Sequence, residues 1–254
     1  MNDTPKPEIM AIRKNFPAIG IGLLLLLPLT LGAQSKQQQD GFYWGLKGGA
    51  TYSTIDRIRE TLISPIYPDD TYTTQETFRP GGLAGLFFDY RFYRSAVATR
   101  LEITYAMLGG DFEYQDVRDL EYRMQFRYDY INIAPMVKLN LVAGSLYVIG
   151  GAEFGINLSG EKITYTSNMS ETVPDLQIQT SLREVLKGQS NVAATLGLGV
   201  ELLDSRLHLE ARYSYGFKDV IETLPNSYYF REMRNRMSYV QVSVGWAIPF
   251  YETY

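Results

Sequence analysis

The only histidine of the chain, His208, is the side chain best suited to proton transfer near neutral pH. Side chains alternate between the two faces of a strand, so His208 shares a face with Glu210 and Arg212. A histidine beside a carboxylate can act as the general base of a hydrolase. However, Glu210 stands where such an enzyme needs a serine, and His208 follows the short turn 203–206 by two residues. We therefore expect an interior, hydrogen-bonded histidine and no catalytic residue.

A larger group of charged residues shares the inner face of the alternating segments described below. These charges could form a selectivity ring in a small-solute channel, or they could pair into a salt-bridged plug, because a narrow barrel is just wide enough for its own side chains. The near balance of four cations and five carboxylates favours the plug, since buried charges need partners. The predicted lumen charge network comprises Lys47, Arg100, Glu102, Lys138, Glu153, Glu201, Glu210 and Arg212, with Asp89 beside them.

A third group consists of carboxylates in a polar stretch that we interpret as a surface loop. Its members are Asp111, Glu113, Asp116, Asp119 and Glu121, with Asp69 and Asp70 in an earlier loop. Carboxylates can hold Ca²⁺, but the Asp-x-Asp-x-Asp-Gly framework is missing, and Arg118 and Arg123 interrupt the run. The chain also lacks cysteine, which excludes disulfides and thiolate metal sites. We expect a solvated loop, with no metal and no cofactor.

His208 and the lumen charge network lie within a set of eight segments in which the two faces of a strand alternate residue by residue, and the strands must position the charged side chains. They span 42–52, 84–90, 97–107, 131–139, 146–158, 192–202, 207–216 and 240–248. In each segment one face is apolar and uncharged, and the other carries the charges together with small residues. A charge on a lipid-facing side would cost about 2–4 kcal/mol at mid-bilayer. This pattern, with 20 tyrosines and 12 phenylalanines, predicts an all-β, eight-stranded, antiparallel up-and-down transmembrane β-barrel.

The connections between these segments alternate strictly in length. Three are short, near 92–95, 142–145 and 203–206, and four are long, near 55–78, 109–125, 159–189 and 217–235. Short periplasmic turns alternating with long extracellular loops are typical of outer-membrane barrels. Two residues do not fit this pattern. Pro135 cannot donate a backbone hydrogen bond within its strand, so we expect a bulge or kink there. Asp129 has the alternation of the lipid-facing residues, and we expect it to lie above the membrane, at the extracellular end of its strand.

The third long loop contains a segment with helical periodicity, residues 175–188. Asp175 or Ser181 could cap its start and Gly188 its end. Its apolar face consists of Ile178, Leu182, Val185 and Leu186. This face could dock a partner or cover the mouth of the barrel, and we favour the cover.

The N-terminus has the layout of an export signal. Arg13 and Lys14 precede the apolar stretch Ile19–Leu31, which ends in small residues. We expect residues 1–33 to be a signal peptide cleaved after Ala33, followed by one barrel domain over residues 41–250. The net charge of −4 argues against nucleic acid as a partner.

Several strand motifs resemble the porin-family, PorT-like outer-membrane β-barrel domain of Gram-negative bacteria. They are Gly45–Ala50, Gly85–Tyr90, Leu101–Tyr105, Tyr130–Lys138, Gly197–Glu201, Glu210–Gly216 and Val242–Trp246. In Tyr130–Lys138, the proline stands one position later than in the family's pattern. The resemblance covers roughly residues 41–250 and implies the barrel fold. PorT itself belongs to the type IX protein secretion machinery.

We therefore expect a non-enzymatic barrel of the cell outer membrane, with a structural or interaction role carried by its extracellular loops. The alternatives are a small-solute or ion channel and a PorT-like component of type IX secretion. The expected partners are outer-membrane lipid, the barrel assembly machinery during insertion, and a protein at the extracellular loops.

Overall fold

A computed structural model of the protein describes residues 41–63, 71–93, 95–142, 145–159, 162–168 and 174–250. The expected signal peptide, residues 1–33, lies outside these ranges, and so do Asp69 and Asp70. Neither helix in the described ranges is long and apolar enough to cross a membrane.

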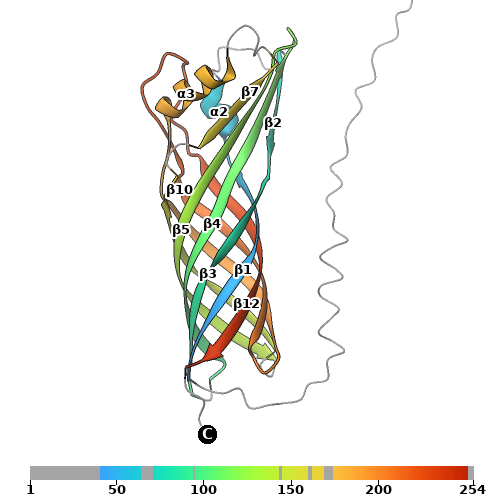
Figure 1. The fold of residues 1–254 in the computed structure, drawn as a ribbon, viewed down its shortest axis with the longest axis vertical. Coiled ribbons are helices and arrows are strands. Elements are labelled where there is room, and N and C mark those ends of the chain that lie inside the picture. The colour runs from blue at the N-terminus through green and yellow to red at the C-terminus, as the bar shows by residue number, and fades with distance from the viewer. Residues whose placement is uncertain are drawn as a thin grey trace, which may run out of the picture. The chain divides into compact units, whose positions relative to one another are not determined.

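Eight long strands form a closed antiparallel ring (Figure 1). They are β1 (Gly41–Ile55), β3 (Arg79–Arg91), β4 (Val97–Asp116), β5 (Glu121–Val142), β6 (Leu146–Asn157), β9 (Asn191–Leu202), β10 (Leu207–Asp219) and β12 (Arg236–Pro249). Each pairs with the strand before and after it in this order, and β1 pairs with β12, which closes the cylinder. The predicted up-and-down barrel and its eight strands are confirmed.

The two faces of the strands are sorted as the alternation predicts. In β4, Leu101 and Ile103 are 42% and 41% exposed on the outer surface, whereas Arg100 and Glu102 are 3% and 2% exposed inside. An outward apolar band therefore faces lipid, and the charged side chains turn into the lumen.

The ends of the barrel differ as expected. The short turns lie at the same end of the barrel as residues 41 and 250. Gly41 lies opposite Arg91, next to the turn 92–95, and the backbone N–H of Phe250 donates to the carbonyl of Phe42 over 3.0 Å. At the opposite, extracellular end, β4 and β5 rise together far beyond the cylinder (Figure 1). Their register runs without interruption from Val97 opposite Leu139 to Gln115 opposite Glu121.

The prediction of a loop over residues 109–125 is therefore wrong, because most of this segment forms a β-hairpin. The reason is an inversion of polarity. Inside the membrane the inward positions of β4 are polar, as at Glu102, whereas above it they are apolar, as at Phe112, and the outward positions become polar. Two short strands flank this hairpin: β2 (Tyr72–Thr77) pairs with β4, and β7 (Ile163–Ser167) pairs with β5.

Two helices and a small sheet lie at the extracellular mouth. They are α2 (Ile58–Leu62), α3 (Asp175–Val185), and β8 (Leu186–Gly188) paired with β11 (Ile221–Thr223). The helix predicted over 175–188 ends three residues early, since Leu186 and Gly188 belong to β8. Pro174 precedes α3 and no side chain caps it, so the predicted caps at Asp175, Ser181 and Gly188 are wrong.

The apolar face of α3 turns toward the barrel. Leu182 and the following Leu186 are buried, and Ile178 and Val185 pack against the same cluster. The prediction that this face covers the mouth is confirmed.

Helix α3 also covers the outer edge of β7. The N–H of Tyr165 donates to Gln179 Oε1 over 3.2 Å, and the N–H of Ser167 donates to Asp175 Oδ2 over 3.1 Å. Arg183 Nε donates to the carbonyl of Ile163 over 3.0 Å. Three backbone groups of an edge strand thus bond to helix side chains instead of another strand.

Pro135 does not produce the predicted bulge. The register of β5 is the same on both sides of it, against β4 and against β6, and the register shift lies between Asn140 and Val142. The pairing of β5 with β6 omits Ala134 and Pro135 and resumes in the same register at Met136 opposite Gly151. The effect of the proline is therefore confined to a local gap in the pairing.

Candidate functional site

The lower lumen holds a cluster of ion-paired side chains that we call the lumen network. It consists of Lys47, Asp89, Arg91, Arg100, Glu102, Lys138, Glu201, Glu210 and Arg212, all buried. Seven of the eight predicted residues belong to it, and so does Asp89. Arg91 was missed because the second segment was ended at residue 90, although its parity with Asp89 would have placed it inside.

Two carboxylates form the centre of the lumen network. Glu102 accepts from Arg212 Nη2 at 2.6 Å and from Lys47 Nζ at 3.0 Å. Glu210 lies 3.2 Å from Lys47 Nζ and also pairs with Arg100 and Arg212. Each carboxylate thus contacts more than one cation, so the charges compensate one another within the barrel.

A second group of ion pairs surrounds Asp89 and Glu201. Lys138 pairs with both carboxylates, and Arg91 Nη2 lies 3.0 Å from Glu201 Oε2. Aromatic rings line these cations: Arg91 lies over the ring of Tyr43 at 4.4 Å and Lys138 Nζ over that of Tyr147 at 4.3 Å. Cation–π contacts add to the ion pairs in such desolvated places.

Glu153 is the predicted residue that stands apart from the ion pairs. Its carboxylate accepts from the hydroxyl of Tyr239 and, over 3.4 Å, from that of Thr195. These hydrogen-bond donors are hydroxyls and not cations, so the structure does not place Glu153 in the lumen network.

His208 is buried near the periplasmic end and both ring nitrogens are engaged. Arg100 Nη2 donates to Nδ1 over 3.0 Å, so Nε2 carries the proton and donates to the carbonyl of Ser205 over 3.0 Å. Ligand atoms of His208, Asp89 and Glu201 lie within 4.8 Å of one another, a spacing that could suit a metal. Both carboxylates are already paired with cations, which disfavours a metal there.

An apolar cluster fills the lumen above the lumen network, and we call it the apolar plug. Its buried members are Ile55, Ile58, Leu62, Leu83, Ala106, Leu108, Phe112, Met124, Phe126, Tyr128, Tyr130, Ile163, Leu182, Leu186, Val220, Ile221, Met237 and Tyr239. It draws on α2, α3 and the upper strands, and so fills the extracellular mouth.

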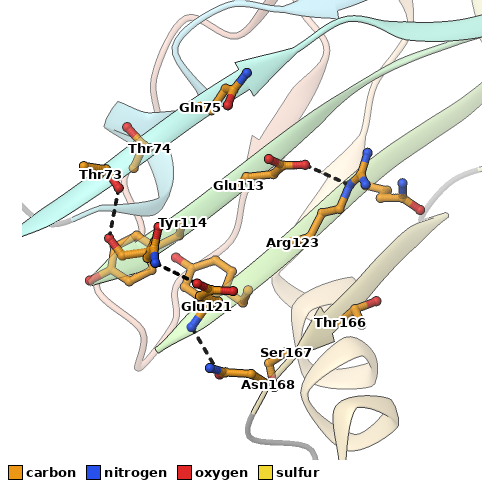
Figure 2. A pocket seen from close by; sticks show the side chains of 13 residues that line it. Thr73, Thr74, Gln75, Glu113, Tyr114, Glu121, Arg123, Thr166, Ser167 and Asn168 are labelled. Carbon is orange, nitrogen blue, oxygen red and sulfur yellow. Dashed lines mark hydrogen bonds and ion pairs between the residues drawn. The ribbon is translucent and has the colours of Figure 1, made fainter. Parts of the chain in front are cut away.

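Above the mouth, β2, the upper parts of β4 and β5, and β7 form a four-stranded sheet that we call the tip sheet. Its outer face carries an open polar groove of about 630 Å³ (Figure 2). Glu113 lies 3.4 Å from Arg123 Nε, and Gln115 Nε2 donates to Glu121 Oε1 over 2.7 Å. Thr166 extends the groove onto β7 (Figure 2). The groove presents hydrogen-bond donors and acceptors to the cell exterior.

The carboxylates of the supposed loop are therefore placed in the tip sheet. Asp111 pairs with Arg79 and Arg123, each at 2.7 Å. Asp116 accepts from the backbone N–H groups of Arg118 and Leu120 and so fixes the hairpin turn. Asp111 and Asp116 therefore bond to different partners and do not point toward a common centre.

The inner face of the tip sheet carries a row of four stacked tyrosines. Ring centroids are 5.6 Å apart for Tyr72 and Tyr114, 4.7 Å for Tyr114 and Tyr122, and 5.6 Å for Tyr122 and Tyr165. Burial raises the pKa of the Tyr122 and Tyr165 hydroxyls. One ring from each strand stiffens the tip sheet through cross-strand stacking.

A closed antiparallel cylinder with an apolar outer band and charges inside defines an integral outer-membrane barrel. Residues 33–222 match the family of the outer membrane protein beta-barrel domain, which is more than half of the chain, so the chain belongs to that family. The protein therefore resides in the outer membrane.

Two solved structures are similar to this chain at low sequence identity. Ail, the attachment invasion locus protein of Yersinia pestis, is 12% identical, with 82% of this chain and 99% of that chain covered and a TM-score of 0.36. The outer membrane protein OprG from Pseudomonas aeruginosa is 11% identical, with 84% and 98% covered and a TM-score of 0.41. No curated protein matches the sequence.

Proposed function

We propose that this protein is a non-enzymatic outer-membrane barrel whose tip sheet binds a protein partner at the cell surface. The observation that carries the proposal is a contrast between two regions. The lumen is filled at two levels, while the extracellular end holds a braced sheet with an open polar groove.

The filled lumen favours an interaction role over transport. A solute would have to pass the apolar plug and then separate the ion pairs of the lumen network. Desolvated ion pairs are costly to break, about 3–5 kcal/mol when one partner is removed. These two obstacles support a barrel that serves as an anchor.

The surroundings of His208 favour a role without catalysis. Arg100 and the carbonyl of Ser205 occupy its two nitrogens, at the end of the barrel away from the groove. A general base needs a free acceptor within reach of the substrate.

Site-specific photo-crosslinking in intact cells tests the proposed partner site. A crosslinker at Gln75 or Thr166, both exposed and lining the groove, should trap one protein, whereas a crosslinker at exposed Glu232, outside the groove, should not. Gln75→Arg with Thr166→Arg should abolish the same complex. Equal trapping from Glu232, or an intact complex in the double variant, would remove the groove from the proposal.

A second candidate is a component of a type IX secretion machine. It is supported by the resemblance of the strand motifs over residues 41–250 to PorT-like domains, from which Tyr130–Lys138 departs by a proline one position later. Deletion of the gene should then block the secretion of exported substrates. If secretion were unchanged, the secretion role would be excluded and the surface-binding role would be the remaining candidate.

We also propose that residues 1–33 direct export and are cleaved after Ala33, and that the barrel assembly machinery inserts the mature chain. The charged and apolar regions before Ala33 support export. N-terminal sequencing of the mature protein should begin at Gln34.

A further inference from the structure

A patch of basic side chains lies on the outer surface of the barrel, directly above its apolar band. We call it the basic rim patch, and it consists of two groups, each with two cations over one buried carboxylate. The upper group is Arg79, Asp111 and Arg123, and the lower group is Arg127, Asp129 and Lys162.

The carboxylates in this patch lie beneath the cations. The side chains of Asp111 and Asp129 are only 6% and 7% exposed, whereas those of Arg123, Arg127 and Lys162 are 48%, 47% and 54% exposed. Glu113, whose side chain is 43% exposed, also lies 3.4 Å from Arg123 Nε and balances the charge of the upper group. The lower group keeps one positive charge in excess and presents a positive surface to a ligand.

Arg127 has the weakest partners in the patch. Its Nε lies 3.8 Å from Asp129 Oδ1, beyond hydrogen-bond distance, and its Nη2 contacts the thioether of Met107 at 2.9 Å. A guanidinium has five N–H donors, and a thioether is a poor acceptor. Arg127 therefore retains capacity for a stronger, anionic acceptor.

The height of the patch identifies the anions that it can meet. The outward positions of β4 are uncharged from Val97 to Met107. Ten residue steps in a strand tilted by about 40° span roughly 25 Å, the height of the apolar band of such barrels. Asp129 pairs with Met107 in the register, so the lower group begins where this band ends.

The spacing of the two groups suits two anions. Arg123 and Arg127 lie four residues apart on the same face of β5, which is about 13 Å along the strand. Charge-assisted contacts to phosphate are among the stronger hydrogen bonds of proteins. At this level of a membrane, lipid phosphates are the anions that the barrel surface meets.

We propose that the basic rim patch binds the phosphorylated headgroup of an outer-leaflet glycolipid, with one phosphate at each group. Arg127 and Lys162 contact the phosphate nearer the acyl chains, and Arg79 and Arg123 contact the other. The upper group shares Arg123 with the groove, whereas no residue of the lower group lines it, and lipid binding does not depend on a surface partner.

Lipid titration of the full chain, followed by native mass spectrometry, tests the proposal. The probes are a bisphosphorylated glucosamine-disaccharide lipid and the same lipid without phosphates. The two test variants, R79Q/D111N/R123Q and R127Q/D129N/K162Q, remove each group without leaving a buried carboxylate unpaired. The matched control is R231Q/E232Q/R234Q, which removes two exposed cations and one exposed carboxylate between β11 and β12.

The wild type and the control should bind the phosphorylated lipid with the same affinity, and each test variant should bind it about tenfold more weakly. Heat-modifiable migration on a gel verifies that every variant is folded. Equal binding of the phosphate-free lipid, undiminished binding by both test variants, or an equal loss in the control would overturn the proposal. If inorganic phosphate bound as tightly as the phosphorylated lipid, the patch would be a general anion site and the proposal of a lipid site would be wrong.

Discussion

Arg100 and Asp89, paired across the register of β3 and β4, contact each other through two parallel hydrogen bonds inside the barrel. Arg100 Nε lies 2.5 Å from Asp89 Oδ1, and Nη2 lies 2.7 Å from Oδ2. The same guanidinium also contacts Glu210 and Nδ1 of His208, so one side chain links both halves of the lumen network.

Replacing Arg100 should therefore destabilise the barrel more than replacing an exposed arginine. Arg100→Ala leaves Asp89 and Glu210 without this partner, and we expect a loss of about 3–5 kcal/mol in the free energy of unfolding. Urea unfolding in detergent, followed by tryptophan fluorescence, measures it. Arg234→Ala, at an exposed position, should change that free energy by less than about 0.5 kcal/mol. Equal effects would contradict a structural role for the network.

Two buried glutamates should respond differently to the loss of charge. Glu153 accepts from hydroxyls, so Glu153→Gln should cost less than about 1 kcal/mol. Glu102→Gln leaves Lys47 and Arg212 without a charged partner and should cost at least about 2 kcal/mol. The same unfolding measurement compares the two variants, and a reversed order would disprove the assignment of Glu153 outside the ion pairs.

At Gly199, whose missing side chain would point into the lumen, any larger residue should destabilise the barrel. A Cβ on Gly199 would lie 2.3 Å from Cζ of Tyr147, whose hydroxyl donates to Glu210 over 2.5 Å. Gly199→Ala should cost about 1–3 kcal/mol through overpacking. Gly48→Ala is the matched control, since the nearest atom to a Cβ there is 3.8 Å away. A similar loss in both variants would point to backbone effects instead.

The purified barrel should be silent in planar bilayers. The apolar plug and the lumen network both lie across the path, so we expect no single-channel openings above the bare membrane. An open porin in the same bilayer serves as the positive control. Stable, ion-selective openings of the folded protein would support the channel alternative.

The cover over the mouth should open when its apolar contact is lost. Leu182 is 3% exposed, and Leu182→Asp should make α3 sensitive to trypsin at Arg183 while the barrel keeps its heat-modifiable migration. Leu176→Asp on the same helix, at a position that is 70% exposed, should stay resistant. Resistance of both variants would show that α3 is held by other contacts.

Within the membrane, the sequence alone was sufficient to predict the fold. Lipid permits no charge on one face and the narrow lumen admits no long apolar run on the other, so residues such as Leu101 and Arg100 reveal their faces by type. The same rule placed most of the lumen network on the inner face. It missed Arg91, because the predicted segment ends at residue 90, and it could not distinguish Glu153, which bonds to hydroxyls, from the carboxylates that pair with cations.

Above the membrane the rule reverses, and the prediction of a loop over residues 109–125 failed for that reason. Water lies outside and the apolar plug inside, so the alternation of Phe112 with Glu113 has the opposite sense to that of Glu102 with Ile103. Carboxylates such as Asp111 and Glu113 then resemble a solvated loop. The tip sheet and its groove depend on pairings between distant segments, such as β2 with β4, which no local pattern encodes.

The bonds between α3 and β7 have a consequence for crowding at the cell surface. An uncovered strand is a template to which any extended chain can add, and neighbouring copies in a dense membrane would be the first to meet it. Gln179, Asp175 and Arg183 occupy three of those bonding positions on β7. The protein can therefore display a tall sheet above the bilayer without offering this edge to the growth of fibres.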